Sequence, residues 1–207
     1  MAIAVMTGGR EEILARVAAA LDRPVRPAAP HRVPVRAGDV ELLARRIEEY
    51  GATVSRAGSD REVAAAVEAA LVGQGAAKVL VPPGLPTEWR QGEIEWVEDD
   101  PPLPYSRLAS ADAVVSGCAL AAAETGTLVL DGGPTQGRRV LTLLPDLHVC
   151  VVLAEDTVAD VPDAIFALAH SGRPVTFISG PSATSDIELN RVEGVHGPRR
   201  LKVVLRG

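Results

Sequence analysis

The side chains best placed to do chemistry lie in a stretch of small residues between Gly117 and Gly126. Glu124 is its one carboxylate, Thr125 adds a hydroxyl group, and an apolar run begins directly after Gly126. Small residues let the backbone approach another group closely, so we take Gly117, Glu124, Thr125 and Gly126 as candidate ligand-binding residues. Glu124 is also a candidate catalytic residue, as a nucleophile, a general base or a hydrogen-bond acceptor. The alternative is a structural carboxylate that accepts backbone N–H bonds inside a tight loop.

Two further turn segments combine glycine with polar side chains. Residues 179–186 offer hydroxyl and backbone N–H groups suited to a carboxylate, with Ser182, Thr184 and Asp186 as candidate ligand-binding residues. The alternative there is a turn leading into a short capped helix. His196, between two glycines, could donate to a carboxylate, exchange protons or bind a metal, or simply make structural hydrogen bonds. We expect the three segments to converge at the carboxyl ends of strands, where open α/β sheets bind ligands.

Arginines, nucleotide-binding fingerprints and cysteines bear on which ligands or cofactors the chain could bind. Arg138 and Arg139 follow a Gly-Gly-Pro turn and could bring positive charge to the same site, or they could form a solvated surface pair. The GxGxxG fingerprint of dinucleotide sites does not occur, and neither does the GxxxxGK[ST] fingerprint of P-loop nucleotide sites. The sequence therefore supports neither kind of site. Cys118 and Cys150 lack the spacing of metal ligands, and we expect no metal or iron–sulfur cluster in this chain.

Composition sets the class of protein. The chain has 207 residues, of which 47% are hydrophobic and only 3% aromatic, so it can bury an aliphatic core. Its net charge of -6 and few aromatic residues argue against nucleic-acid binding. It has no signal-like apolar segment and no run long enough to cross a membrane. We expect a soluble cytoplasmic protein.

The spacing of apolar residues predicts alternating helices and strands in the main part of the chain. Helices are expected over residues 39–50, 60–72 and 161–169, and strands over 53–57, 78–82, 94–97, 110–116, 127–130, 148–153, 174–179 and 201–205. This alternation predicts a mostly parallel sheet covered by helices. About ten residues separate the strands ending at 116 and starting at 127, too few for a crossover helix. These two strands are therefore antiparallel, or the second belongs to a small side sheet, and we expect a mixed architecture.

The N-terminal part differs from the rest. Residues 11–21 predict an amphipathic helix, and the prolines between Pro24 and Pro34 predict an extended basic arm. The arm is either a connector or a segment that packs on a partner chain. We interpret residues 1–207 as a single domain, with the helix and arm, about 1–36, outside the main sheet.

Four motifs, in this order, resemble those of the LUD domain family: residues 121–127, 143–148, 180–188 and 194–198. The resemblance implies a three-layer α/β/α fold similar to the NagB/RpiA/CoA-transferase group, and a role in a three-protein system that oxidises L-lactate to pyruvate. It also implies that this chain is an accessory subunit without cofactors, while iron–sulfur proteins are its partners and carry the electrons. Such a subunit could bind a small carboxylate or join its partners.

Two alternatives stay open. One is a stand-alone enzyme for an acyl-CoA, sugar-phosphate or folate-like ligand that uses Glu124, because the catalytic glutamate of CoA-transferases also precedes a glycine by two residues. The other is a regulatory module that senses a metabolite.

Overall fold

The computed structural model describes residues 8–21, 34–169, 171–184, 192–193 and 197–207. These belong to two units, Met1–Val33 and Pro34–Gly207. In the first unit, α1 (Gly8–Leu21) confirms the predicted helix, and its apolar residues Ile13, Leu14, Val17 and Leu21 are exposed. The predicted arm between residues 22 and 33 lies outside the described residues.

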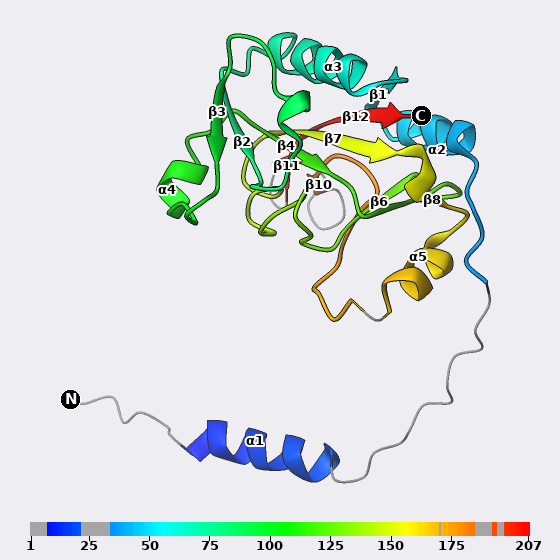
Figure 1. Cartoon of the computed structure of the whole chain (residues 1–207). Helices are drawn as coiled ribbons and strands as arrows, with labels where there is room; N and C mark the ends of the chain where they lie inside the picture. The colour runs from blue at the N-terminus through cyan, green and yellow to red at the C-terminus, as the bar shows by residue number, and fades with distance from the viewer. Residues whose placement is uncertain (1–7, 22–33, 170, 185–191, 194–196) are drawn as a thin grey trace. The chain divides into compact units, whose positions relative to one another are not determined.

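The second unit is built on a six-stranded sheet in which every neighbouring pair is parallel (Figure 1). The strands, in spatial order, are β1 (Thr53–Ala57), β12 (Arg200–Arg206), β7 (Leu147–Leu153), β4 (Ala113–Gly117), β2 (Lys78–Val81) and β3 (Glu95–Glu98). The two long strands, β7 and β12, are neighbours inside the sheet, and β7 and β4 lie at its centre. The central strands β7 and β4 are buried along almost their whole length, because both faces of the sheet are covered there.

Each of the three main helices begins after a polar capping residue, close to the start that the sequence predicted. Asp39 caps α2 (Val40–Glu49) by accepting from two backbone N–H groups, and Ser59 caps α3 (Asp60–Val72). Asp160 likewise caps α5 (Val161–Leu168). Three short elements complete the set: η1 (Thr87–Trp89), α4 (Tyr105–Leu108) and η2 (Ala154–Asp156).

A second, four-stranded sheet has the order β8 (Thr157–Val158), β5 (Leu120–Ala122), β6 (Thr127–Leu130) and β9 (Thr176–Ile178). β6 is antiparallel to both of its neighbours, whereas β5 and β8 are parallel. The side-sheet alternative for residues 127–130 is therefore correct. The expected mixture of directions occurs in this second sheet, and the main sheet is wholly parallel. A small antiparallel pair, β10 (Ala183–Thr184) and β11 (Val192–Glu193), follows β9.

Side-chain alternation along β7 shows how the layers pack. Leu147, Val149 and Val151 join the core under α3, while Cys150 and Val152 join the core under α2 and the second sheet. The expected three-layer arrangement is thus modified, because the second face is covered largely by another sheet. The outer face of that sheet is covered in turn by α5.

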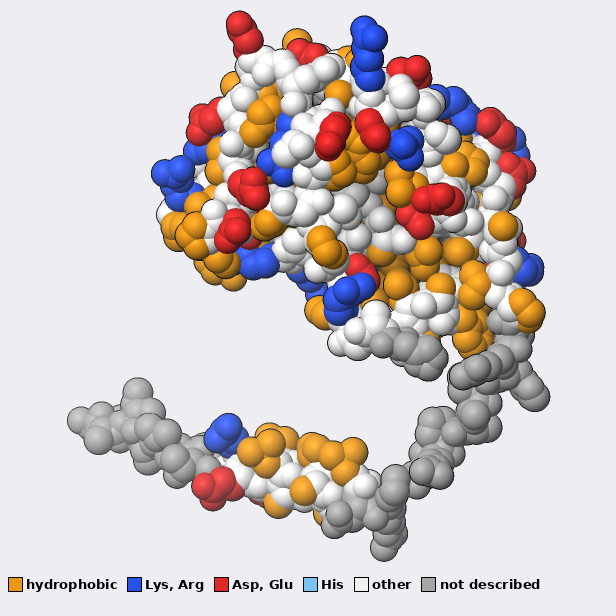
Figure 2. Space-filling view, in the orientation of Figure 1, with side chains coloured by type: hydrophobic (Ala, Val, Ile, Leu, Met, Phe, Trp, Pro, Cys, Tyr) orange, Lys and Arg blue, Asp and Glu red, His pale blue; other side chains and the backbone are white. Residues whose placement is uncertain are grey.

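The surface of the second unit carries charges of both signs. Figure 2 shows acidic and basic side chains interspersed over the visible face, with no broad patch of one sign. None of the helices in the described part of the chain has the length and apolar character that a membrane span requires.

Candidate functional site

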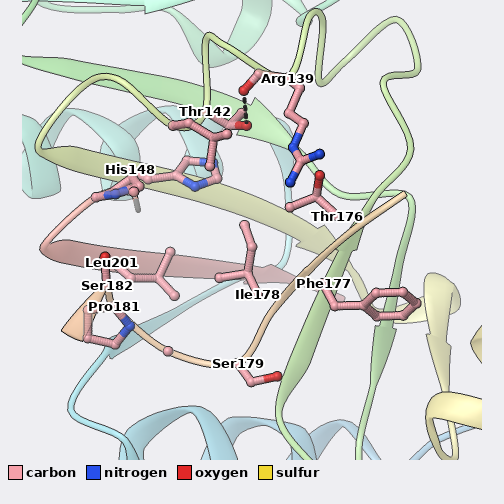
Figure 3. Close-up of a pocket in the computed structure, with 14 residues that line it drawn as sticks. Arg139, Thr142, His148, Thr176, Phe177, Ile178, Ser179, Pro181, Ser182 and Leu201 are labelled. Atoms are coloured by element: carbon pink, nitrogen blue, oxygen red, sulfur yellow. Dashed lines mark hydrogen bonds between the residues drawn. The ribbon is translucent and has the colours of Figure 1, made fainter. Parts of the chain in front are cut away.

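A pocket of about 370 Å³ lies between the two sheets, where β9 passes the beginnings of β7 and β12 (Figure 3). His148 and Leu201, the second residues of β7 and β12, form one wall. The expected position at the carboxyl ends of the strands is therefore wrong for this pocket. The second sheet covers the face of the main sheet, so the hollow forms between the two sheets near the amino ends of the strands.

Strand pairing explains which residues of β9 face the pocket. Thr176 and Ile178 are paired with Leu130 and Leu128, whose side chains point into the core between the two sheets. Paired residues lie on the same side of a sheet, so Thr176 and Ile178 point the same way. The ring of Phe177 points away from the pocket in Figure 3 and is 45% exposed.

His148 is the ionisable one of two buried polar residues that line the pocket in the described part of the chain, and the other is Thr142. Its neighbours in β7 point toward α3, so His148 projects from the opposite face, and its side chain is completely buried. Its Nε2 lies 2.8 Å from Oγ of Ser116, and its Nδ1 has no hydrogen-bond partner among the described residues. Burial lowers the pKa of His148 to about 4. The imidazole is therefore neutral at physiological pH.

The contact with Ser116 limits what Nδ1 can do. The single hydroxyl proton of Ser116 can go to the carbonyl oxygen of Gly117, 2.9 Å away, or to Nε2 of His148. In the first case Nε2 carries the ring proton and Nδ1 is an acceptor. In the second case Nδ1 carries the proton and is a donor. Either tautomer leaves Nδ1 with one unused hydrogen bond in the buried wall, among the residues that the structure describes.

Arg139 supplies the positive charge. Figure 3 shows its guanidinium reaching toward Thr176 on the pocket wall. Arg138, next to it, is held by Asp99 at 2.6 and 2.7 Å. Arg139, in contrast, has no ion pair with any of the described residues. Arg138 is thus held by Asp99, whereas the exposed Arg139 lines the pocket, and its meeting with an anion stays a prediction.

The pocket lies in a region that matches a known family. A family model described as the LUD domain matches residues 40–205. The chain belongs to the LUD domain family. Among its relatives, the lactate utilization protein C of Deinococcus radiodurans is 46% identical over 184 residues, covering 86% of this chain and 85% of that protein. A lactate utilization protein C from an Exiguobacterium species is 34% identical over 120 residues, covering 54% of this chain and 52% of that protein.

The likeness extends to three dimensions. The crystal structure of a DUF162 family protein from Deinococcus radiodurans matches this LUD-domain protein with a TM-score of 0.70 and 40% identity. The match covers 81% of this chain and 96% of that chain.

The three turn segments of the LUD domain do contact one another. The backbone N–H of Ser182 donates to the carbonyl oxygen of Pro198 at 2.8 Å, and both residues line the pocket. Thr127 Oγ1 lies 2.7 Å from Thr125 Oγ1 and 2.8 Å from Ser179 Oγ. A chain of hydroxyl groups therefore links the Glu124 segment to the pocket.

The predicted residues of the first segment lie outside the pocket lining. Glu124 is exposed, and its backbone N–H donates to Ala159. A Cβ on Gly117 would lie 2.5 Å from Oγ1 of Thr135. Gly126 has a φ of +65°, and a Cβ there would lie 2.9 Å from the backbone of Arg46. The small residues are thus required by packing and turn geometry. The ligand-binding role of this segment stays a prediction.

The remaining predicted residues are less defined. Ser182 lines the pocket, and Thr184 belongs to β10. Asp186 and His196 lie outside the described residues, so their predicted roles stay predictions.

His148 was not predicted as a site residue, although it has a recognisable signal. It is the single ionisable side chain other than Cys150 in the otherwise apolar strand LHVCVVL. A buried polar residue is more informative than another apolar one. Thr142 and Thr176 gave no such signal, because single threonines occur in many loops and strands.

The two cysteines, distant in the sequence, are neighbours in the fold. A hydrogen bond with Cys118, together with burial, raises the pKa of the Cys150 thiol well above its ordinary value. Both are free thiols. Within the ranges that the structure describes, no group of three His, Cys, Asp or Glu side chains is arranged to hold a metal ion.

Proposed function

We propose that this LUD-domain protein is an accessory subunit, without a cofactor of its own, of a cytoplasmic system that oxidises L-lactate to pyruvate. Similarity to lactate utilization protein C over most of the chain supports this role. We further propose that the fold is similar to the NagB/RpiA/CoA-transferase group and that the partners are iron–sulfur proteins. The sequence has only two cysteines, whereas a typical iron–sulfur cluster takes four cysteine ligands.

Within this role, the pocket binds a small carboxylate. The observation that carries the proposal is the guanidinium of Arg139, which lines the pocket and forms no ion pair with any residue that the structure describes. A guanidinium can donate hydrogen bonds to both oxygens of a carboxylate at once. The hydroxyl of Thr176 is near the same guanidinium in Figure 3 and can donate to the acid.

The chemistry of these groups favours binding over proton transfer. A histidine with a pKa of about 4 is a weak base near pH 7, where efficient general bases have pKa values close to the working pH. The pocket would then hold a carboxylic acid, and partner subunits would accept the electrons from lactate.

Calorimetric titration of the full chain with L-lactate and pyruvate tests the binding. Replacing Arg139 with glutamine should weaken carboxylate binding at least tenfold, because the charged partner is lost. The matched control is Arg45→Gln, since Arg45 is an exposed arginine on α2 outside the pocket. Equal weakening by both substitutions would refute a specific carboxylate site.

A genetic test addresses the role in the cell. Deletion of the gene should abolish growth on L-lactate, and the wild-type copy should restore it. The tagged chain should also co-purify with iron–sulfur proteins. Normal growth of the deletion strain on L-lactate would overturn the proposed role.

A further inference from the structure

The walls of the Arg139 pocket differ in polarity from one side to the other. Arg139, Thr142, Thr176 and His148 lie on one side in Figure 3. The opposite side carries the apolar side chains of Ile178, Leu201 and Pro181 together with the hydroxyl-bearing side chains of Ser179 and Ser182. A ligand with a carboxylate at Arg139 and an apolar part against Ile178 and Leu201 matches these two sides.

The pocket is also larger than a three-carbon acid requires. Lactate and pyruvate have six non-hydrogen atoms, which at roughly 30 Å³ each, the share of a molecule in liquid water, need at most about 180 Å³. The pocket measures about 370 Å³. About half of the space would then stay unfilled, which leaves room for further ligand atoms beside the apolar side chains of Ile178 and Leu201.

The charges around the pocket limit the acid to one carboxylate. Arg139 is the one Lys or Arg among the described residues that line it. Two nearby arginines are already neutralised, because Arg138 pairs with Asp99 and Arg173 pairs with Asp131. A second carboxylate or a phosphate group would meet no further Lys or Arg among the lining residues that the structure describes.

We infer that the ligand of this pocket is a monocarboxylic acid with an apolar substituent of roughly four to eight carbons, larger than lactate. Its carboxylate lies on Arg139 and its substituent lies against Ile178 and Leu201. The inference rests on the proposed carboxylate binding at Arg139 and names the class of acid that fits best. An aliphatic or aryl-substituted acid satisfies both sides of the pocket.

Burying one methylene group changes affinity by about fourfold. Calorimetric titration of the full chain with propionate, butyrate, hexanoate and octanoate, at fixed ionic strength, measures this dependence directly. We expect affinity to rise about three- to fourfold per methylene until the pocket is full. Phenyllactate should bind at least tenfold more tightly than lactate. Hexanamide, which lacks the charge, should bind far more weakly than hexanoate.

A pair of variants tests the location of the apolar side. Ile178→Ala should reduce hexanoate affinity about tenfold, because Ile178 lines the pocket. Ile165→Ala should have no effect, because Ile165 is an exposed isoleucine on α5 outside the pocket. Similar affinities for propionate and octanoate, with binding still lost in Arg139→Gln, would overturn this inference and leave the proposed function standing. Binding of none of these acids, nor of lactate and pyruvate, would overturn both.

Discussion

Protonation of His148 should make the stability of this protein depend on pH in a way that one substitution removes. The imidazole is fully buried, and within the described part of the chain its one hydrogen-bond partner is the hydroxyl of Ser116. Burial lowers its pKa from 6.5 to about 4. Since the folded pKa is below the unfolded one, the unfolded chain binds the proton more readily. Stability is therefore complete above pH 6.5 and decreases as the pH falls toward 4.

The size of the effect follows from these two pKa values. Each pKa unit corresponds to about 1.4 kcal/mol, so the loss in the free energy of unfolding reaches about 2 kcal/mol at pH 5 and about 3 kcal/mol at pH 4. The charged and titratable groups around His148 do not obscure this window. Arg139 is an arginine and stays charged throughout, and Cys150, near Ser116, stays a neutral thiol because its pKa is raised. Acidic side chains elsewhere titrate equally in the wild type and in a His148 variant.

Urea denaturation at several pH values between 7.5 and 4.5 measures the effect as a difference between the wild type and His148→Gln. Glutamine cannot ionise, and its amide can still reach Ser116. Whatever its absolute stability, the variant should lack the His148 contribution, so its difference from the wild type should shift by about 2 kcal/mol between pH 7.5 and pH 5. His148→Asn should behave in the same way. A difference that stays constant with pH would show that His148 titrates normally and that the burial argument is incorrect.

Three further perturbations follow from the packing. Gly126→Ala should destabilise the protein by about 1–3 kcal/mol in urea denaturation, because its φ is +65° and the new methyl group would meet the backbone of Arg46; an unchanged midpoint would contradict this turn geometry. Asp99→Asn should cost about 1–3 kcal/mol at pH 7. Although burial opposes ionisation of Asp99, the Arg138 guanidinium holds its pKa below the ordinary value, so the cost should shrink as the pH falls through that range. Cys150 should resist iodoacetamide in the folded protein and react after unfolding, since the thiolate is the reactive form; rapid labelling of Cys150 in the native state, read by peptide mass spectrometry, would contradict its burial.

Many elements of the two sheets and their helices could be predicted because local signals agree there. The helix at Asp60–Val72 and the strands at Thr53–Ala57 and Thr127–Leu130 match the predicted bounds. Caps, glycines and apolar periodicity all indicate the same ends in these places. The short strands β5 and β8 were missed, because two or three small residues carry no periodic signal.

The pocket could be predicted only in part, for reasons that lie in the tertiary structure. Glycine and serine in a turn indicate exposed backbone and hydroxyl groups, and Ser182 does line the pocket. The local sequence around Arg138 and Arg139 is the same for both, yet Asp99, 39 residues before Arg138, decides which one is neutralised. Similarly, the position of β9 across β7 and β12 depends on sheet packing, which places His148 at a pocket rather than in a closed core.

The small-residue segment around Glu124 acquires a role through the register of the second sheet. β5 and β6 form a hairpin whose turn includes Gly126, and β6 in turn pairs with β9. A one-residue shift in the β6–β9 pairing would turn Thr176 and Ile178 outward and put Phe177 into the pocket. The turn geometry at Gly126 and the contact between Thr127 and Ser179 oppose such a shift. The segment therefore shapes the pocket by positioning β9, even though Glu124 itself lies at the surface.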